Sequence, residues 1–424
     1  MKTLAIVGTG VAGLGCAHFL HHQFDLTLFE QGMHPGGHAN TVTVDEQGTK
    51  IRIDTGFMVF NHVTYPNLTR LFRELRVQTK PTSMSFSVQH GPSGTEYNGS
   101  SVNQLFGQRR NILRPAHWRM LAAVNRFNAE AVAALDDPRW AGHTLGAYVA
   151  ERGYGSEMLH RYLVPMGSAV WSTPPEKMLE FPATTLLRFW HNHGFLGMTT
   201  QHQWHTVVGG SQAYVAKVMA PFRGRVRLAT KAVRVERRGG KALVTTADGA
   251  VQEFDKVILA AHADQSLALL ADATDLEARL LAPFKYQRNT ATLHTDASFM
   301  PRTRRCWASW NYRVDAEPGG GVRTSTHYWM NSLQDVSRRE NYFVSLNVEA
   351  QVAPGKVLMV IEYEHPLFDR AAVAAQRELP ALNRLGPEQT TYFAGAWFRY
   401  GFHEDGFTSA LECARAVTGR EIWT

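Results

Sequence analysis

The stretch LAIVGTGVAG, residues 4–13, decides the fold. Its first four residues are apolar and typical of a buried parallel strand, and residues 14–20 have helical character. The glycines between them have separate roles: Gly8 forms a tight turn, Gly10 lets the backbone approach a pyrophosphate, and Gly13 lets the helix pack closely on the strand. The stretch therefore predicts a dinucleotide-binding turn.

The residues that follow complete a βαβ unit. The helix N-terminus at Val11 and Ala12 offers unpaired N–H groups and a positive dipole end to phosphates. A second apolar run, residues 26–29, ends in Glu30 with Gln31 beside it. Glu30 stands where a carboxylate accepts hydrogen bonds from an adenosine ribose. A glycine turn alone is weak evidence, but strand, glycines, helix, strand and acid together predict a Rossmann-type unit.

The next segment distinguishes between possible dinucleotides. Residues 31–41, QGMHPGGHANT, resemble the second glycine motif of the flavin amine oxidase and phytoene desaturase superfamily, and residues 54–58 resemble the family segment that returns to the flavin ring. In that family the first of these segments runs beside the FAD pyrophosphate and ribityl chain. The resemblance implies non-covalent FAD rather than NAD, although His38 replaces the usual arginine. The FAD contacts that it implies are Gly36, Gly37, His38, Thr41, Gly56, Phe57 and Met58.

The middle and the end of the chain continue the resemblance. Residues 207–211, a strand-like run at 226–235 and residues 255–262 follow the family order in which the chain returns to the FAD domain. Here Val233 matches the position whose backbone pairs with adenine. Near the C-terminus, a helix over 408–417 is expected to point its N–H groups at the flavin pyrimidine. The further FAD contacts implied are Ala260, Gly395, Ala396, Glu404, Asp405, Gly406 and Phe407.

Three segments carry a closer resemblance. They are GHANT at 37–41, GFMVFN at 56–61 with TYPN at 64–67, and YGFHEDG at 400–406. Together they resemble the flavoprotein domain fused to plant cyclopropane fatty acid synthases and its free-standing bacterial counterparts, one branch of which resembles the acyl desaturase of furan fatty acid synthesis. This resemblance implies an FAD-dependent desaturase or dehydrogenase of lipid acyl chains. It also implies a functional link to a lipid methyltransferase.

The predicted fold class is α/β. A Rossmann-like FAD-binding domain of the glutathione reductase and amine oxidase type is expected from three separate pieces of chain, 1–75, 207–282 and 388–424. The pieces between them, 76–206 and 283–387, are expected to form a discontinuous α+β substrate-binding domain.

The candidate catalytic residues are His403, Tyr400 and Glu404, because they flank the turn expected to meet the flavin ring. His403 either acts as a base or only fixes that turn. In the amine oxidases of the superfamily a lysine acts near the flavin, but the matching strand at 290–294 has no lysine. A double-bond isomerase of acyl chains, an amine oxidase and a non-catalytic flavoprotein partner remain alternatives to the dehydrogenase.

Composition limits the remaining possibilities. The chain has 424 residues, 44% of them hydrophobic, with a net charge of +7 and three cysteines far apart, which predicts no zinc site and no disulfide framework. No nucleic-acid motif and no apolar run of about 18 residues is present, so a cytoplasmic location is expected. Arg109, Arg110 and Arg114 precede a predicted helix that could rest on the inner face of an anionic membrane as a peripheral contact. The alternative is an ordinary core-facing helix with solvated arginines.

The sequence makes one prediction about the purified protein. No cysteine matches a covalent attachment site for FAD, so the protein should be yellow and should release its flavin on acid or heat precipitation. The absorbance of the supernatant measures this release. Colour that stays with the denatured pellet would contradict the prediction.

Overall fold

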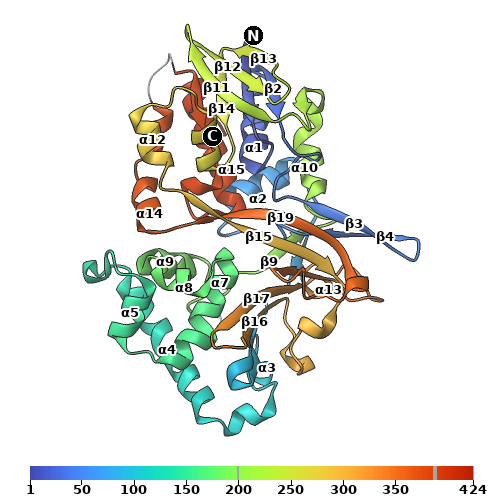
Figure 1. Ribbon diagram of the computed structural model, residues 1–424, viewed down its shortest axis with the longest axis vertical. Helices are drawn as coiled ribbons and strands as arrows, with labels where there is room; N and C mark the ends of the chain where they lie inside the picture. The colour runs from blue at the N-terminus through green and yellow to red at the C-terminus, as the bar shows by residue number, and fades with distance from the viewer. Residues whose placement is uncertain (198–199, 385–388, 424) are drawn as a thin grey trace.

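The computed structural model describes residues 1–197, 200–384 and 389–423. One end of the molecule, at the top of Figure 1, carries a parallel sheet with helices, and the other end carries a group of helices beside a curved sheet. Strands β15 and β19 cross the middle between the two ends (Figure 1). The predicted boundary at residue 388 and the last residue of the chain, 424, lie outside the described residues, and the domain boundaries stay predictions.

The parallel sheet has five strands in the order β10-β2-β1-β14-β20. Its strands come from early, middle and late parts of the chain: β1 (Lys2–Val7), β2 (Phe24–Phe29), β10 (Val226–Arg227), β14 (Lys256–Leu259) and β20 (Thr391–Phe393). Ile6 pairs with Leu28 on one side and with Ile258 on the other. This arrangement confirms the predicted α/β fold with a Rossmann-like core.

The two faces of β1 show why the strand is uniformly apolar. Leu4 and Ile6 pack into a core cluster with α1 (Val11–Leu20) and α15 (His403–Thr418), whereas Ala5 and Val7 pack into a second cluster on the opposite face. Successive side chains of a strand point to opposite faces, so a strand covered on both sides needs apolar residues throughout.

The antiparallel parts complete the sheet structure. A three-stranded sheet contains β11 (Ala232–Arg238), β12 (Lys241–Thr246) and β13 (Val251–Phe254). A seven-stranded sheet has the order β19-β15-β18-β17-β16-β7-β8. Its strands are β7 (Phe86–His90), β8 (Thr95–Asn98), β15 (Lys285–His294), β16 (Trp310–Ala316), β17 (Val322–Trp329), β18 (Phe343–Leu346) and β19 (Val357–Leu367). The smaller pairings are β3 (Thr41–Glu46) with β4 (Thr49–Asp54), and β5 (Phe60–Asn61) and β6 (Thr79–Thr82) with β9 (Trp204–Val207).

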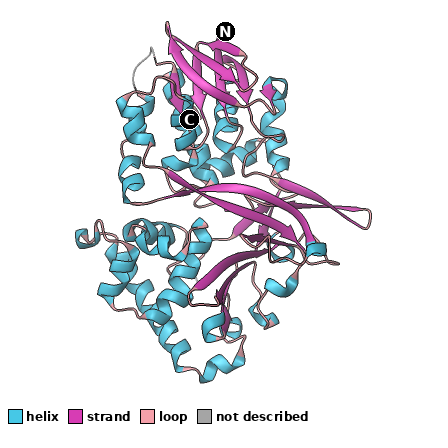
Figure 2. Ribbon diagram, in the orientation of Figure 1, coloured by secondary structure: helices cyan, strands magenta, loops and turns pink. Residues whose placement is uncertain are grey.

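Most helices of the lower end come from one continuous stretch of chain, and Figure 2 shows them gathered on one side of the strands. They are α3 (Val102–Leu105), α4 (Pro115–Ala134), α5 (Leu145–Arg152), α6 (Ser156–Met158), α7 (Val164–Trp171), α8 (Pro175–Glu180) and α9 (Ala183–Asn192). The other helices are α2 (Pro66–Glu74), α10 (Gln212–Met219), α11 (Ala263–Leu269), α12 (Asp275–Leu281), α13 (Met330–Leu333) and α14 (Arg370–Gln376). None of the helices in the described ranges has the length and apolarity needed to cross a membrane.

Two element predictions need correction. The strand-like run at 226–235 is split between β10, which joins the parallel sheet, and β11, which joins the three-stranded sheet; Ala229 between them has a φ of 50°. The last helix begins at His403 rather than at residue 408, because the carboxylate of Asp405 accepts the backbone N–H of Phe402 at 2.9 Å and caps an earlier turn.

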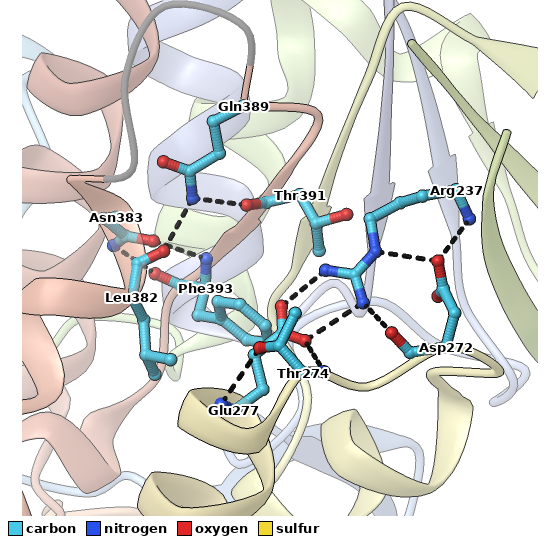
Figure 3. Close-up of polar contacts among 9 residues, drawn as sticks. All are labelled: Arg237, Asp272, Thr274, Glu277, Leu382, Asn383, Gln389, Thr391 and Phe393. Atoms are coloured by element: carbon cyan, nitrogen blue, oxygen red, sulfur yellow. Dashed lines mark hydrogen bonds and ion pairs between the residues drawn. The ribbon is translucent and has the colours of Figure 1, made fainter. Parts of the chain in front are cut away.

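A buried ion pair joins the three-stranded sheet to α12 (Figure 3). The Arg237 guanidinium on β11 donates to both carboxylate oxygens of Glu277 at 2.6 and 3.0 Å and to Asp272 at 3.1 Å. Glu277 also accepts the backbone N–H of Thr274, which closes the first turn of α12. The same view shows Asn383, whose side chain exchanges two hydrogen bonds of 2.9 Å with the backbone of Phe393 and so covers the outer edge of β20.

The Arg237 pair yields a stability prediction. Arg237→Met should lower the free energy of unfolding by about 3–5 kcal/mol, because Glu277, with a side chain 1% exposed, is left buried without its charged partner. Arg234→Met on the same strand is the matched control. Arg234 pairs with Glu236 while 54% exposed, so its loss should change stability by less than about 0.5 kcal/mol. Chemical denaturation of the FAD-loaded protein measures the stability of both variants. Equal losses in the two would show that the Arg237–Glu277 pair matters no more to stability than the exposed pair of Arg234.

Candidate active site

One cavity of about 1340 Å³ connects the two ends of the molecule. It begins at the glycine turn after β1 and continues past β19 to α3 and α4. The predicted site residues that line it are Gly8, Gly10, Val11, Ala12, Glu30, Gln31, Gly37, His38, Gly56, Phe57, Met58, Val233, Ala260, Gly395, Ala396, Tyr400 and His403.

The three glycines of the first turn have three different surroundings. A Cβ at Gly8, where φ is +102°, would lie 2.7 Å from the carbonyl oxygen of Ala260. A Cβ at Gly13 would collide with the carbonyl oxygen of Gly8, so this glycine lets α1 pack against the turn. A Cβ at Gly10 would meet no protein atom within 4 Å. Protein packing therefore explains why residues 8 and 13 are glycine. Gly10 instead leaves open space at a helix N-terminus, where a pyrophosphate fits.

Glu30 shapes the same turn from the end of β2. Its carboxylate accepts the backbone N–H of Thr9 at 3.0 Å, the Thr9 hydroxyl at 2.6 Å and the backbone N–H of Gly32 at 2.7 Å. A carboxylate has about four lone-pair sites, so Glu30 can hold the turn and still accept a ribose hydroxyl. Val233, whose side chain is 43% exposed, lines this end of the cavity from β11.

Two residues of the segment 31–41 that are predicted to contact FAD do not line the cavity. The Thr41 hydroxyl donates to Asp54 at 2.5 Å and accepts the backbone N–H of Gln212 at 3.0 Å. Gly36 has a φ of +113°, and a Cβ there would lie 2.6 Å from the carbonyl oxygen of Ala39. Both residues hold the second glycine motif in place, and Gln31, Gly37 and His38 are the members of that motif that reach the cavity.

Of the predicted site residues at the start of α15, His403 lines the cavity and the next four residues do not. The Glu404 carboxylate accepts the backbone N–H groups of Asn67 and Leu68 at 3.0 and 2.9 Å, so it caps the N-terminus of α2 and does not line the cavity. Gly406 packs on Val11, and Phe407 lies in the core. Burial raises the pKa of Asp405, which caps α15, to about 7. These residues support α15, which begins at the cavity. Because Glu404 does not line the cavity, it is unsuited to serve as the proton acceptor.

His403 lines the cavity, and contacts with Tyr214 and Phe57 hold its ring in place. Its Nε2 lies 2.5 Å from the hydroxyl of Tyr214, and its ring stacks on Phe57 with centroids 3.7 Å apart. Burial lowers the pKa of His403 to about 3, so the imidazole is neutral at physiological pH. These contacts favour the interpretation in which His403 fixes the turn. Tyr400 also lines the cavity, and burial raises the pKa of its phenol, so that it stays protonated.

The structure adds a group of histidines that the sequence patterns did not single out. His262 follows β14 and His365 lies on β19, and both line the cavity with His38. The ring of His38 lies 5.3 Å from that of His365 and stacks on Tyr363 at 4.8 Å. Burial lowers the pKa of His38 well below its usual value, and the neighbouring histidines lower it further. A compact group of neutral imidazoles therefore faces the cavity where the second glycine motif ends.

A chain of amides fixes the tautomer of His365. The backbone N–H of Thr290 donates to Asn347 Oδ1 at 2.9 Å, and Asn347 Nδ2 donates to Asn289 Oδ1 at 2.9 Å. Asn289 Nδ2 then donates to His365 Nδ1 at 3.0 Å. Because a backbone N–H can only donate, the direction of the whole chain is set. Burial lowers the pKa of His365 to about 4, so the neutral ring carries its proton on Nε2 and acts as a donor.

His262 has the opposite arrangement. Its Nδ1 lies 3.4 Å from a carboxylate oxygen of Glu364, and its ring stacks on Tyr286 at 4.1 Å. A carboxylate beside Nδ1 favours a proton on that nitrogen and leaves Nε2 free to accept. Burial lowers the pKa of His262, while Glu364 opposes that shift. His262, with the Glu364 carboxylate beside its Nδ1, is therefore better placed than His403 to accept a proton in the cavity.

Comparison with known proteins identifies the family. The family model for flavin-containing amine oxidoreductases matches residues 11–418. The chain belongs to this family. No curated protein sequence matches it.

Solved structures share the fold at low sequence identity. A double mutant of putrescine oxidase, redesigned in its cofactor binding, is 14% identical, with a TM-score of 0.67 over 99% of both chains. The conjugated linoleic acid-producing fatty acid isomerase from P. acnes is 17% identical, with a TM-score of 0.66 over 99% of this chain and 98% of its own. Cyclohexylamine oxidase from Brevibacterium oxydans is 15% identical, with a TM-score of 0.66 over 99% of both chains.

The protein is thus a flavin-containing oxidoreductase that binds FAD, and the cavity fits this cofactor. The open space at Gly10 would hold the pyrophosphate, and Glu30 and Val233, which line the same cavity, would lie at the adenosine end. Gly56, Phe57 and Gly395 line the part that leads toward the histidines. No group of three or more His, Cys, Asp or Glu suited to a metal occurs among the residues that the structure describes.

Beyond the FAD-binding part, the cavity continues as an apolar arm. We define this arm by Met84, Phe86, Leu105, Met120, Leu121 and Val124, which come from β7, α3, α4 and the adjoining loops. The amides of Asn125 and Asn128 are its neutral polar groups on α4. Among the described residues that line the cavity, the carboxylates are Glu30 and Glu364, and neither lies on an element of the arm.

Gly10 provides a test of the FAD site. Gly10→Val should abolish FAD binding while the protein remains folded, because the backbone there has a φ of −65° and the added side chain enters only the open space. FAD content per protein and thermal unfolding measure the two effects. Gly13→Val is the contrasting control and should impair folding itself, because its side chain meets backbone. A Gly10→Val protein with a full complement of FAD would show that the pyrophosphate lies elsewhere.

Proposed function

We propose that the protein is a dehydrogenase or desaturase that removes a hydride and a proton from a fatty acyl chain of a lipid. FAD supplies the hydride acceptor, flavin N5. The observation that carries the proposal is the apolar arm, which opens directly into the FAD-binding part of the same cavity. The link to a lipid methyltransferase rests on resemblance alone and belongs to the same proposal.

The charge distribution argues for an acyl chain over an amine. An ammonium group in a buried arm needs a carboxylate partner, since an unpaired buried charge is strongly disfavoured. The arm has no carboxylate among its described residues. The lysine expected of an amine oxidase is also missing: β15 carries Lys285 at its exposed start and no lysine within 290–294.

The proton of the second C–H bond needs an acceptor that is neutral at physiological pH. His262 satisfies this requirement, because burial lowers its pKa and a Glu364 carboxylate oxygen lies 3.4 Å from its Nδ1. His365 presents a fixed N–H donor to the same cavity. We assign His403 a positioning role through Tyr214 and Phe57, and Tyr400 the role of a protonated wall residue.

A double-bond isomerase of acyl chains is the second candidate. It is favoured by the fatty acid isomerase among the structural neighbours, which aligns over nearly the whole chain. The same arm would hold its substrate, and the hydride would return to a different carbon of that chain. The two candidates therefore differ in the product and not in the binding site.

Anaerobic mixing of the FAD-loaded protein with phospholipids that carry unsaturated or methyl-branched acyl chains tests the proposal. Desaturation should bleach the flavin and yield a lipid that has lost two hydrogens by mass spectrometry. An unchanged mass with a moved double bond would establish the isomerase instead. Flavin bleached by polyamines and by no lipid would overturn both.

A variant in the arm sharpens this experiment. Leu121→Trp should keep FAD and slow flavin reduction by acyl chains on the order of 100-fold, because the larger ring displaces the chain from its reacting position. Val132→Trp, at an exposed position of the same helix, is the matched control and should reduce at the normal rate. Equal rates in the two variants would show that the substrate does not enter through the arm.

A further inference from the structure

Helices α3 and α4 lie at the end of the molecule farthest from the parallel sheet (Figure 1), and four large apolar side chains on or beside them are exposed. Val102 on α3 is 65% exposed, and Trp118 on α4 is 51% exposed. Ile112 and Leu113, in the turn before α4, are 48% and 85% exposed. We call these four residues the apolar rim. Large apolar side chains gathered on one surface mark an interaction site more often than a solvated one.

Two residues of the apolar rim lie at an opening of the cavity. Val102 and Trp118 both line the cavity, and both are more than half exposed, so the cavity reaches the surface between them. Their neighbours toward the interior, Leu105 and Leu121, belong to the apolar arm. The Trp118 indole donates to the carbonyl of Ile112 at 2.9 Å, which holds the ring at this mouth.

The surface beside the rim is positively charged. Arg109 donates to the carbonyls of Asn103 and Phe106, Arg110 to the carbonyl of Gly94, and Arg114 to the carbonyls of residues 93 and 94. These acceptors are neutral, and no ion pair involves the three arginines within the described ranges of the chain. Arg119, one turn into α4, pairs with Glu157 at 2.6 Å. The three arginines therefore keep their charge uncompensated.

We propose that the apolar rim and these arginines dock on an anionic lipid bilayer, so that an acyl chain passes from the bilayer through the mouth into the apolar arm. An indole and aliphatic side chains at a bilayer surface bury apolar area among the acyl chains, while arginines meet the phosphates of the headgroups. A bilayer fits better than a protein partner, because a protein seated on the rim would close the mouth. This inference rests on the proposed function for its substrate, but docking can be measured without turnover.

The test is sedimentation of the FAD-loaded protein with vesicles. Wild type should bind vesicles of phosphatidylcholine mixed with phosphatidylglycerol, and binding should weaken as salt rises. Leu113→Glu should weaken this binding by at least about tenfold, since it places a charge at the most exposed rim position. Arg109→Gln with Arg110→Gln should also weaken it on the order of tenfold. Val132→Glu, on the same helix outside the rim, is the matched control and should bind as wild type does.

The outcomes separate docking from function. Failure of wild type to bind the mixed vesicles, or equal binding by Leu113→Glu and Val132→Glu, would overturn the proposal. Equal binding of wild type to pure phosphatidylcholine would overturn the assignment to an anionic surface. If Leu113→Glu unfolds, Leu113→Ser replaces it with the same expected direction. Normal docking with no lipid able to bleach the flavin would leave the docking surface in place and refute the proposed function.

Discussion

The close contact of α1 with the turn after β1 is the constraint on which the site depends. Gly13 has no Cβ, so the helix starts directly against the carbonyl oxygen of Gly8. This brings the first N–H groups of α1 to the edge of the parallel sheet and leaves the space at Gly10 open. Glu30 then holds the turn through Thr9. A side chain at Gly10 would fill the open space, whereas one at Gly13 would push α1 away from the turn.

The second constraint is that burial keeps the imidazoles beyond the cradle uncharged. His403, His365 and His38 have pKa values lowered by burial, and each is neutral at physiological pH. Hydrogen bonds fix the proton of His365, as the amide chain from Thr290 shows, whereas the Glu364 carboxylate lies beside His262. A donor and an acceptor therefore coexist on two imidazoles of the same cavity.

The sequence predicts most of what is local and little of what depends on pairing between distant segments. The glycine turn, Glu30 and the two strands of the first βαβ unit follow from spacing and apolar runs, because a βαβ unit is built from contiguous residues. The capping of α2 by Glu404 joins positions more than 300 residues apart, and no local pattern indicates it. The same holds for His262 and Glu364, which meet only because β14 ends beside β19. The spacing of Tyr363 and His365, two residues apart on an extended segment, indicates only that their side chains share one face of the strand.

The split of the run at 226–235 shows the same limit within a single segment. Both halves have strand-forming residues, so composition does not reveal the turn at Ala229 that sends them into different sheets. The consequence is functional, since this turn brings Val233 to the cavity. On the proposed function, the preference of the apolar arm for an acyl chain over an amine likewise depends on something that a motif search cannot detect, the lack of a carboxylate among its described residues. An ammonium group entering the arm would lose its hydration and find no carboxylate among the described residues, whereas an acyl chain loses only contact with water or lipid. On the proposed function, the arm would select an acyl chain because its described walls carry no carboxylate, whereas the cradle offers FAD the Glu30 carboxylate and the N–H groups at the start of α1.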